Sequence, residues 1–454
     1  MRLARLELKD VGPFEDAVFE IPEPKGPGEL VLFEGPNGSG KTTIVQAIAC
    51  ALDVGPRAGT NIQGSPWKEF SRRCRNESTL AFDSDERGGL SVLSVTESTP
   101  QQGWTNHASA QLLQTSVHLA NSTKGSASWA AFAYRGHQPT PMVQTRGPAD
   151  IAAPPMLGAL SFGAHGPASA YFGQLLTNIE FDRIKAALYA QETAPSEKRD
   201  EMARIAHERR ESLRRFETVF SRVLDRVFRI EFPFGKHSPG IAIDGEQVPL
   251  DLLGEGMRST ISWLADLMVR LERIPWSDTS RSPLEQEFWL ILDEIDESLH
   301  PTMQARVLPA VRELFPNARI YATTHSPFVV ASIGEGTIFA IRPDKDHKVR
   351  GQVEARALER GQSLELVTTD IFQAPSGFVD QWTRDALDVH KRDVRRFQRT
   401  GSIDWDAFLA RRAELMKLND EVRTVVAMQE VPIRTEIDRR MLAREESREL
   451  GTGT

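Results

Sequence analysis

The sequence feature that constrains the fold most is a glycine-rich loop between an apolar run and a helical pattern near the N-terminus. Gly35, Gly40, Lys41 and Thr42 fit G-x-x-x-x-G-K-[ST], in which backbone N–H groups and the lysine bind phosphate and the hydroxyl ligates Mg²⁺. Such a chain would show this pattern by chance only about 0.02 times. The apolar run predicts a buried strand, and the helix after the loop directs its N-terminal end at the anion. The sequence therefore predicts a nucleotide phosphate site made of Gly35, Pro36, Asn37, Gly38, Ser39, Gly40, Lys41, Thr42 and Thr43.

The composition is that of an ordinary globular protein. A chain of 454 residues with 40% hydrophobic residues can form two or three domains with a large core. Cys50 and Cys74 offer no disulfide framework, and no apolar stretch approaches the roughly 20 residues of a membrane span, so we expect a cytoplasmic protein. The net charge of −8 gives no global attraction to nucleic acid, so direct contact with DNA or RNA would need a local basic patch.

Two further apolar runs end in residues that suit phosphate chemistry. One is followed by Asp293 and Glu294, and the next ends at Thr324 and His325. We call the glycine-rich loop at residues 35–43 the P-loop. At the end of a strand beside the one that precedes the P-loop, Asp293 can hold Mg²⁺ through water and Glu294 can polarise a water towards the γ-phosphate. His325 can reach the same phosphate from the end of the adjacent strand.

The order of elements predicts an α/β protein with additions. Four runs in the first part alternate like strands of a small antiparallel sheet, at residues 78–82, 90–96, 112–119 and 129–134. A charged helical segment follows, in which glutamates are interleaved with arginines; this favours a salt-bridged face over a phosphate-binding one. We divide the chain into a first nucleotide-binding lobe at 1–165, a helical insert at 166–230, a second lobe at 231–350 and a helical C-terminal region at 351–454.

Four sequence boxes occur in an order that resembles one group of ATPases. Residues 35–42, 252–259, 290–301 and 322–327 resemble the boxes of ABC-type ATPases of the SMC/RecF-like and OLD-like branch. The last two boxes are similar to those of AAA-family ATPases paired with nucleases in bacterial anti-phage modules such as Septu and related retron systems. The resemblance implies a P-loop NTPase of ABC-ATPase type, with a mixed central sheet, an antiparallel β subdomain, a helical insert and a helical C-terminal region.

The resemblance also implies a role for each box. ATP phosphates bind the P-loop, Thr42 and Asp293 serve Mg²⁺, Glu294 is the general base, and His325 is the switch histidine. Residues 297–300 face the opposite protomer. A signature loop closes over the ATP of a second subunit and contains Gly254, Glu255 and Gly256. The chain departs from the family at Gly254, where a serine is usual, and the position of the family's Q-loop glutamine is not identified, with Gln138 a weak candidate.

These features predict an ATPase that forms a homodimer or higher homo-oligomer around ATP and regulates a partner effector, a nuclease in anti-phage defence. DNA or RNA would then be reached through the partner. The alternative is a RecF/SMC-like DNA-repair or DNA-clamping ATPase that acts directly on DNA. A third hypothesis makes the chain itself a nuclease through Asp344 and Asp346, but these residues are better explained as a hairpin turn. A GTPase is excluded because no Asn-Lys-x-Asp box is present.

Overall fold

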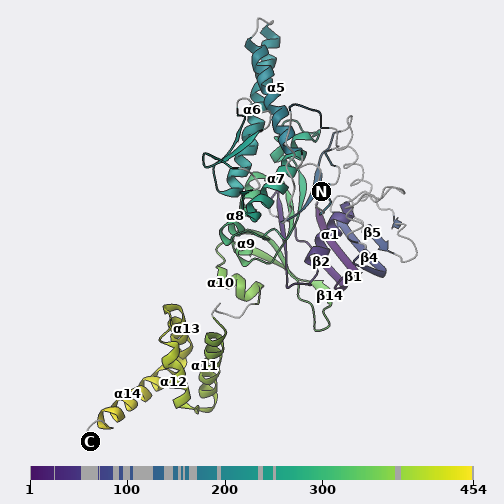
Figure 1. The fold of residues 1–454 in the computed structure, drawn as a ribbon. Coiled ribbons are helices and arrows are strands. Elements are labelled where there is room, and N and C mark those ends of the chain that lie inside the picture. The colour runs from purple at the N-terminus through teal and green to yellow at the C-terminus, as the bar shows by residue number, and fades with distance from the viewer. Residues whose placement is uncertain are drawn as a thin grey trace. The chain divides into compact units, whose positions relative to one another are not determined.

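The chain forms two compact units, Met1–Gln373 and Ala374–Thr454, and each is described by itself. The structure is a computed structural model (Figure 1). It describes residues 2–24, 26–52, 70, 72–84, 91–95, 103–105, 126–136, 147–151, 155–156, 159–162, 171–191, 196–233, 239–248, 252–373 and 380–451.

The first unit is organised around a six-stranded sheet with the order β15-β13-β3-β12-β11-β7. Its strands are β3 (Glu29–Glu34), β7 (Ala130–Arg135), β11 (Phe288–Asp293), β12 (Arg319–Thr324), β13 (Glu335–Ala340) and β15 (Ala355–Glu359). All neighbours pair in parallel except β15, which is antiparallel to β13. Every residue of β3 and β11 is buried, because both faces of the sheet are covered; this explains their unbroken apolar runs.

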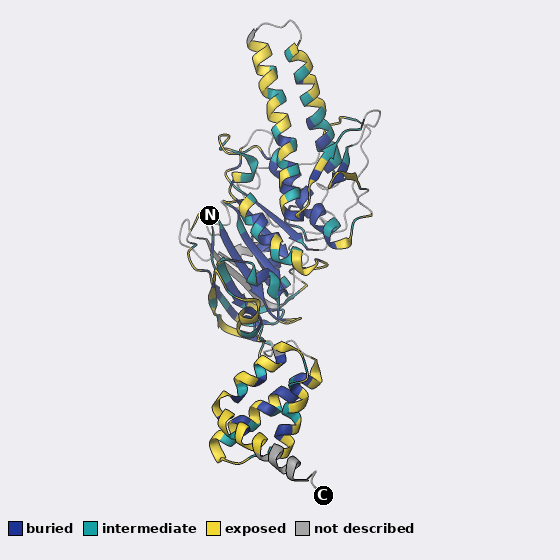
Figure 2. Cartoon of the chain, turned by 90° about the vertical axis from the view of Figure 1, so that its left-hand side faces the viewer, coloured by how far each residue is buried: buried dark blue, intermediate teal, exposed yellow. Residues whose placement is uncertain are grey.

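The alternating side chains of β3 enter two hydrophobic cores. Leu30 and Leu32 pack with helices that include α7 (Glu255–Arg273) and α8 (Pro301–Leu314). Val31 and Phe33 pack with α1 (Lys41–Leu52) and the second sheet. Figure 2 shows that the strands of this unit are mostly buried. The P-loop is therefore fixed between a strand and a helix that both lie inside the core.

A second sheet covers the α1 face, with the order β14-β2-β1-β4-β5-β6. Its strands are β1 (Leu3–Val11), β2 (Phe14–Glu20), β4 (Cys74–Ser84), β5 (Ser91–Val95), β6 (Gly103–Thr105) and β14 (Val349–Val353). The pairs from β2 to β6 are antiparallel, and β14 joins β2 in parallel. The expected runs 78–82 and 90–96 thus lie in an antiparallel sheet, whereas 112–119 lies outside the described residues.

Two expectations about strand neighbours are wrong. The run 129–134 does not join the antiparallel sheet, since β7 pairs in parallel with β11 in the central sheet. A short apolar run fits a fully buried parallel strand as well as an antiparallel one, so its pattern cannot decide the partner. The strand that ends in Asp293 is also not beside the P-loop strand, because β12 lies between β11 and β3.

The helical insert is a pair of long helices, α5 (Phe172–Gln191) and α6 (Ser196–Leu224), that run side by side (Figures 1 and 2). Phe216, Phe220 and Val223 of α6 are buried, whereas Val227 lies past the helix end and is exposed. Arginines of α6 form ion pairs with neighbouring carboxylates, such as Arg204 with Glu208. The insert is followed by a three-stranded sheet of β8 (Phe228–Glu231), β9 (Gly240–Ile243) and β10 (Glu246–Gln247).

The second unit is a helical bundle made of α11 (Gln381–Thr400), α12 (Trp405–Leu415), α13 (Asp420–Glu430) and α14 (Arg434–Gly451). The division after Gln373 falls later than the expected one at 351, because β14 and β15 complete the two sheets of the first unit. Both are short edge strands with many charged residues, whose pattern hardly differs from a charged helix. Among the helices of the described residues, none has the length and apolar character to cross a membrane.

Candidate nucleotide site

The P-loop follows β3 and has a backbone that only glycine allows at two points. Gly38 and Gly40 have positive φ angles of 80° and 98°. A Cβ on Gly40 would lie 2.6 Å from Phe14 and Pro13, which come from the β1–β2 turn. The second sheet is thus in direct contact with the loop and fixes its shape.

Lys41 lies at the start of α1 and folds back over this loop. Its Nζ donates to the carbonyl oxygens of Gly35 (2.7 Å) and Pro36 (3.1 Å). Burial lowers the pKa of Lys41, and nearby carboxylates, Glu34 first among them, oppose this shift. The lysine is therefore a largely desolvated cation held against the loop, as phosphate binding requires.

The two expected magnesium ligands meet at the edge of the sheet. Thr42 Oγ1 donates to Asp293 Oδ1 at 3.1 Å, and Thr323 Oγ1 donates to the same oxygen at 2.8 Å. Asp293 is 1% exposed. Burial raises its pKa, while the hydrogen bonds from the two threonines lower it. A carboxylate and a hydroxyl oxygen at this spacing form the hard-oxygen donor set that Mg²⁺ prefers.

Glu294 leaves the end of β11 in a left-handed turn with φ 54°. Its N–H donates to Thr323 Oγ1 at 2.7 Å, so one hydroxyl fixes both acidic residues. Its carboxylate has no hydrogen-bond partner among the residues that the structure describes. The side chain is therefore positioned by its backbone and left available for chemistry.

His325 follows the neighbouring strand β12, and its N–H donates to both carboxylate oxygens of Asp296, at 3.2 and 3.3 Å. Burial lowers the pKa of His325, and the positive charge of Lys41 acts in the same direction. Asp296 and Glu294 act weakly against this shift. The ring is thus neutral at neutral pH and can either donate or accept a hydrogen bond.

The expected signature loop lies at the N-terminal end of α7. Gly254 is the N-cap residue, is exposed, and has nothing within 4 Å of where a Cβ would be. Gly256 is buried against the segment 297–300, since its Cβ would lie 2.2 Å from the carbonyl oxygen of Ser298. Glu297 and His300 of that segment are exposed. The two stretches expected to face a second subunit therefore pack against each other within one chain.

Four residues at the site were not predicted from the sequence: Thr323, Asp296, Arg135 and Gly136. Arg135 Nε lies 3.9 Å from Asp293 Oδ2. Gly136 N donates to the carbonyl of Asp293 at 2.7 Å, and a Cβ on Gly136 would lie 1.9 Å from the carbonyl oxygen of Glu294. The sequence does carry a signal for Arg135 and Gly136, because the run 130–136 is apolar and ends in polar residues, as the runs of β11 and β12 do. Gln138 lies outside the described residues.

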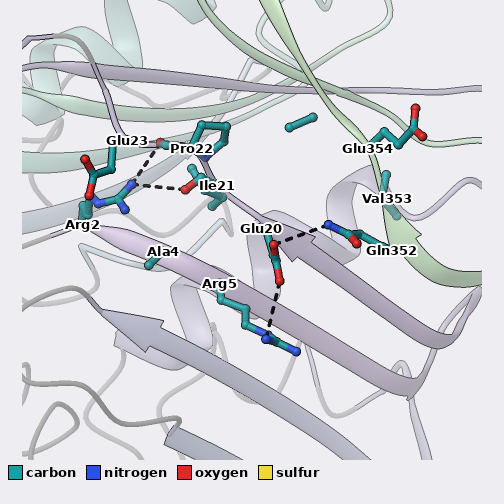
Figure 3. A pocket seen from close by; sticks show the side chains of 11 residues that line it. Arg2, Ala4, Arg5, Glu20, Ile21, Pro22, Glu23, Gln352, Val353 and Glu354 are labelled. Atoms are coloured by element: carbon teal, nitrogen blue, oxygen red, sulfur yellow. Dashed lines mark hydrogen bonds and ion pairs between the residues drawn. The ribbon is translucent and has the colours of Figure 1, made fainter.

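Two other places are not the site. Asp344, for which a hairpin turn is favoured over a nuclease role, accepts the N–H groups of Asp346 and Lys348 and pairs with Arg350, so it organises the turn before β14. A surface pocket of 620 Å³ lies between β1, β2 and β14 (Figure 3). Both of its arginines are already engaged: Arg5 pairs with Glu20, and Arg2 donates to the carbonyl oxygens of Ile21 and Pro22 after β2. This leaves no free charge for a phosphate.

The first unit has the features of a P-loop NTPase: a P-loop between β3 and α1, an acidic pair after β11 and a histidine after β12. Residues 5–97 match the model of an AAA domain. Residues 192–331 match a second AAA-domain model, whose description mentions the AbiEii toxin of a type IV TA system.

Curated relatives agree with this class. The protein named "Retron Ec83 probable ATPase" from Escherichia coli is 28% identical over 168 residues, which is 33% of this chain and 30% of that protein. The Septu protein PtuA of Bacillus thuringiensis is 29% identical over 133 residues, 29% of this chain and 34% of that protein. The alignments thus span about a third of either relative. The predicted resemblance is confirmed: parts of this chain match AAA-domain models and are similar to a retron ATPase and to a Septu protein.

Among solved structures, the chain is similar to an SMC head bound to the C-winged helix domain of ScpA. That match has 15% identity and a TM-score of 0.41, and covers 80% of this chain and 98% of the other.

Proposed function

We propose that this chain binds and hydrolyses ATP with Mg²⁺, closes into a dimer around the nucleotide, and thereby regulates a partner effector, a nuclease in anti-phage defence. The observation that supports this best is the convergence of Lys41, Thr42 and Asp293 with Glu294 and His325 at one edge of the sheet. The ends of parallel strands are where α/β proteins bind nucleotides.

The residues present fit ATP and Mg²⁺. Ser39 Oγ is buried without a hydrogen-bond partner in the structure, and a Cβ on Gly38 would meet nothing within 4 Å, so the loop has a free hydroxyl and an open side. The first N–H groups of α1 point out of the helix at the same place. Thr42 and Asp293 would hold the cation. When bound, Mg²⁺ would offset the charge on the β- and γ-phosphates.

The chain's own groups divide the work. Lys41 and the P-loop N–H groups bind and orient phosphate oxygens. Glu294 accepts a proton from the attacking water on its carboxylate, and the Thr323 hydroxyl keeps the backbone of Glu294 in place for that transfer. His325, neutral and held by Asp296, donates a hydrogen bond at the phosphate side.

The dimer part of the proposal depends on the signature loop. Gly254 and the start of α7 are exposed and present backbone N–H groups, which can bind an anion from a second molecule. Because Gly256 packs on Ser298, the signature loop and the segment 297–300 would respond together when a second subunit approaches. The effector part depends on the likeness to ATPases named for retron and Septu systems.

Glu294→Gln is the test. Removing a general base typically slows a reaction by about 10²- to 10⁴-fold, so we expect ATP hydrolysis to fall by that factor while ATP binding persists. Trapped ATP should then hold the dimer, measured as mass by light scattering with ATP and Mg²⁺. Glu313→Gln, on the exposed Arg222–Glu313 ion pair, is the matched control. A Glu294→Gln protein that binds ATP and stays wholly monomeric would contradict dimer formation.

A further inference from the structure

One face of α11 in the second unit carries a dense group of arginines. Arg392, Arg395, Arg396 and Arg399 have the spacing of three and four residues that places side chains on one side of a helix. All four are exposed. The buried residues of the helix, such as Val394, lie on the opposite side. We call these four residues the α11 arginine face.

Folding does not account for this face. Like charges three and four residues apart destabilise a helix, and the α11 arginine face contains four such pairs. Only Arg399 lies in the last turn, where the helix dipole favours a cation. The acidic neighbour Asp393 is already paired with Arg411 of α12.

The arginines of α6 provide a contrast within the same chain. There Arg204 pairs with Glu208, Arg209 with Asp182 and Arg214 with Glu211. On α11, no ion pair of Arg395, Arg396 or Arg399 is found with any residue that the structure describes. The positive charge of the α11 arginine face is therefore directed to solvent.

The shape of the surface suits an extended polyanion. The four arginines line a surface pocket of 960 Å³, whose other lining residues are Val389, Asp393, Gln398 and Thr400. All belong to α11, so the surface is open and not a closed ligand cavity. None of the described residues that line it is aromatic and able to stack on a base, which favours contact with phosphates over binding of unpaired bases. From Arg392 to Arg399 the helix rises about 10 Å, a length over which each duplex strand carries about three phosphates.

We propose that the α11 arginine face binds the phosphate backbone of double-stranded nucleic acid. This is the local basic patch that a chain of net charge −8 needs for such a contact. Binding is independent of base sequence, because the contacts are to phosphates alone. The surface belongs to the second unit, whereas the residues of the proposed ATP chemistry belong to the first.

The test measures the affinity of the full chain for a fluorescein-labelled 30-base-pair DNA duplex as salt is raised. Log affinity falls linearly with log salt, and each arginine that binds a phosphate makes this fall steeper by about 0.9. The variant Arg395→Gln/Arg396→Gln/Arg399→Gln should therefore have a slope that is less steep by about 2.7. For three such arginines, that slope corresponds to about a 40-fold difference in affinity between 50 and 200 mM salt. Arg396→Gln alone should give about a third of the change.

The matched control is Arg204→Gln/Arg209→Gln/Arg214→Gln, which removes the same charge from ion-paired positions on α6. We expect its salt slope to stay close to that of the unaltered chain, and we expect ATP hydrolysis without DNA to be the same in all variants. An equal decrease of the slope in the control, or no duplex binding by the unaltered chain, would overturn the proposal. So would tighter binding to phosphatidylserine vesicles or to single strands, with the duplex left unbound.

Discussion

At the scale of single residues, Thr323 connects the two acidic groups of the site. Its hydroxyl donates to Asp293 and accepts the N–H of Glu294, and it is fully buried. Thr323→Val keeps the shape but leaves that N–H without a partner. A buried unsatisfied donor costs about 1–3 kcal/mol, so we expect the free energy of unfolding in urea to fall by that amount. Hydrolysis should also need more Mg²⁺, because one of the hydrogen bonds that orient Asp293 is absent from this variant.

Thr337→Val is the control, since this threonine also lies on a central strand but makes no contact with the carboxylates. We expect it to leave the magnesium dependence unchanged. Equal magnesium requirements in the Thr323 variant and in the unaltered chain would show that Thr323 supports only the fold.

His325 predicts a pH dependence of stability with a definite sign. Its pKa in the folded chain is below the ordinary value of 6.5, so below that value the unfolded chain binds the proton more readily. The contribution of the neutral His325 ring to the free energy of unfolding is therefore fully present above pH 6.5. It is lost as the pH falls from 6.5 through the lower pKa of the folded chain. We expect His325→Gln to lose less stability than the unaltered chain between pH 7 and about 5, measured by urea denaturation.

His347→Gln, in the exposed turn before β14 and outside the nucleotide site, is the control. An unaltered chain whose stability is flat from pH 7 to 5, or a His325→Gln chain with the same slope as the original, would show that burial does not act on this ring as inferred.

At the scale of elements, the sequence predicted the strands of the site better than their neighbours. The runs before Gly35, Asp293 and His325 are continuous apolar stretches that end in polar residues, and each is a central strand. Their order was not predictable, because parallel strands that are buried on both faces carry no mark of which strand lies beside them. Arg135 was missed for this reason: its position opposite Asp293 depends on the β7–β11 pairing.

The start of α7 makes a prediction about the departure from the family pattern at Gly254. Its Cβ position is open, so Gly254→Ser should fold without strain. The hydroxyl would add a hydrogen-bond donor at the exposed end of α7. A serine N-cap stabilises a helix by only a few tenths of a kcal/mol more than a glycine N-cap. We expect a larger dimer fraction at limiting ATP, measured by light scattering, with little change in thermal stability.

Gly256→Ser is the contrasting variant, two residues along the same loop. Its Cβ would lie 2.2 Å from the Ser298 carbonyl oxygen, so the loop or the segment 297–300 must shift. We expect it to be less stable and to dimerise less. If Gly254→Ser dimerised no better than the original chain, the loop would not bind the nucleotide of a second subunit through this position.

At the scale of the whole molecule, the question is whether the site is complete in one chain or shared by two. Within one chain, Thr42 of the P-loop bonds to Asp293, and Thr323 bonds to both Asp293 and Glu294. His325 follows the strand that carries Thr323. The signature loop instead contacts Ser298 and presents Gly254 to solvent. In a two-fold dimer, the P-loop of each chain would face the signature loop of the other. A P-loop defect and a signature-loop defect in the same chain would therefore damage two different sites.

Mixing two inactive chains tests this arrangement. Lys41→Ala removes the phosphate contact, and Gly254→Glu places a negative charge on the open side of the signature loop. In a mixed dimer, one site has both defects and the other has neither. An equal mixture should therefore recover about a quarter of the original hydrolysis rate, because half of the dimers are mixed and each has one intact site.

A mixture of Lys41→Ala with Glu294→Gln is the matched control, since both defects lie on the P-loop side and leave no intact site. Recovery in the first mixture alone would support a shared site, whereas an active Gly254→Glu chain or no recovery in either mixture would place all of the chemistry in one subunit.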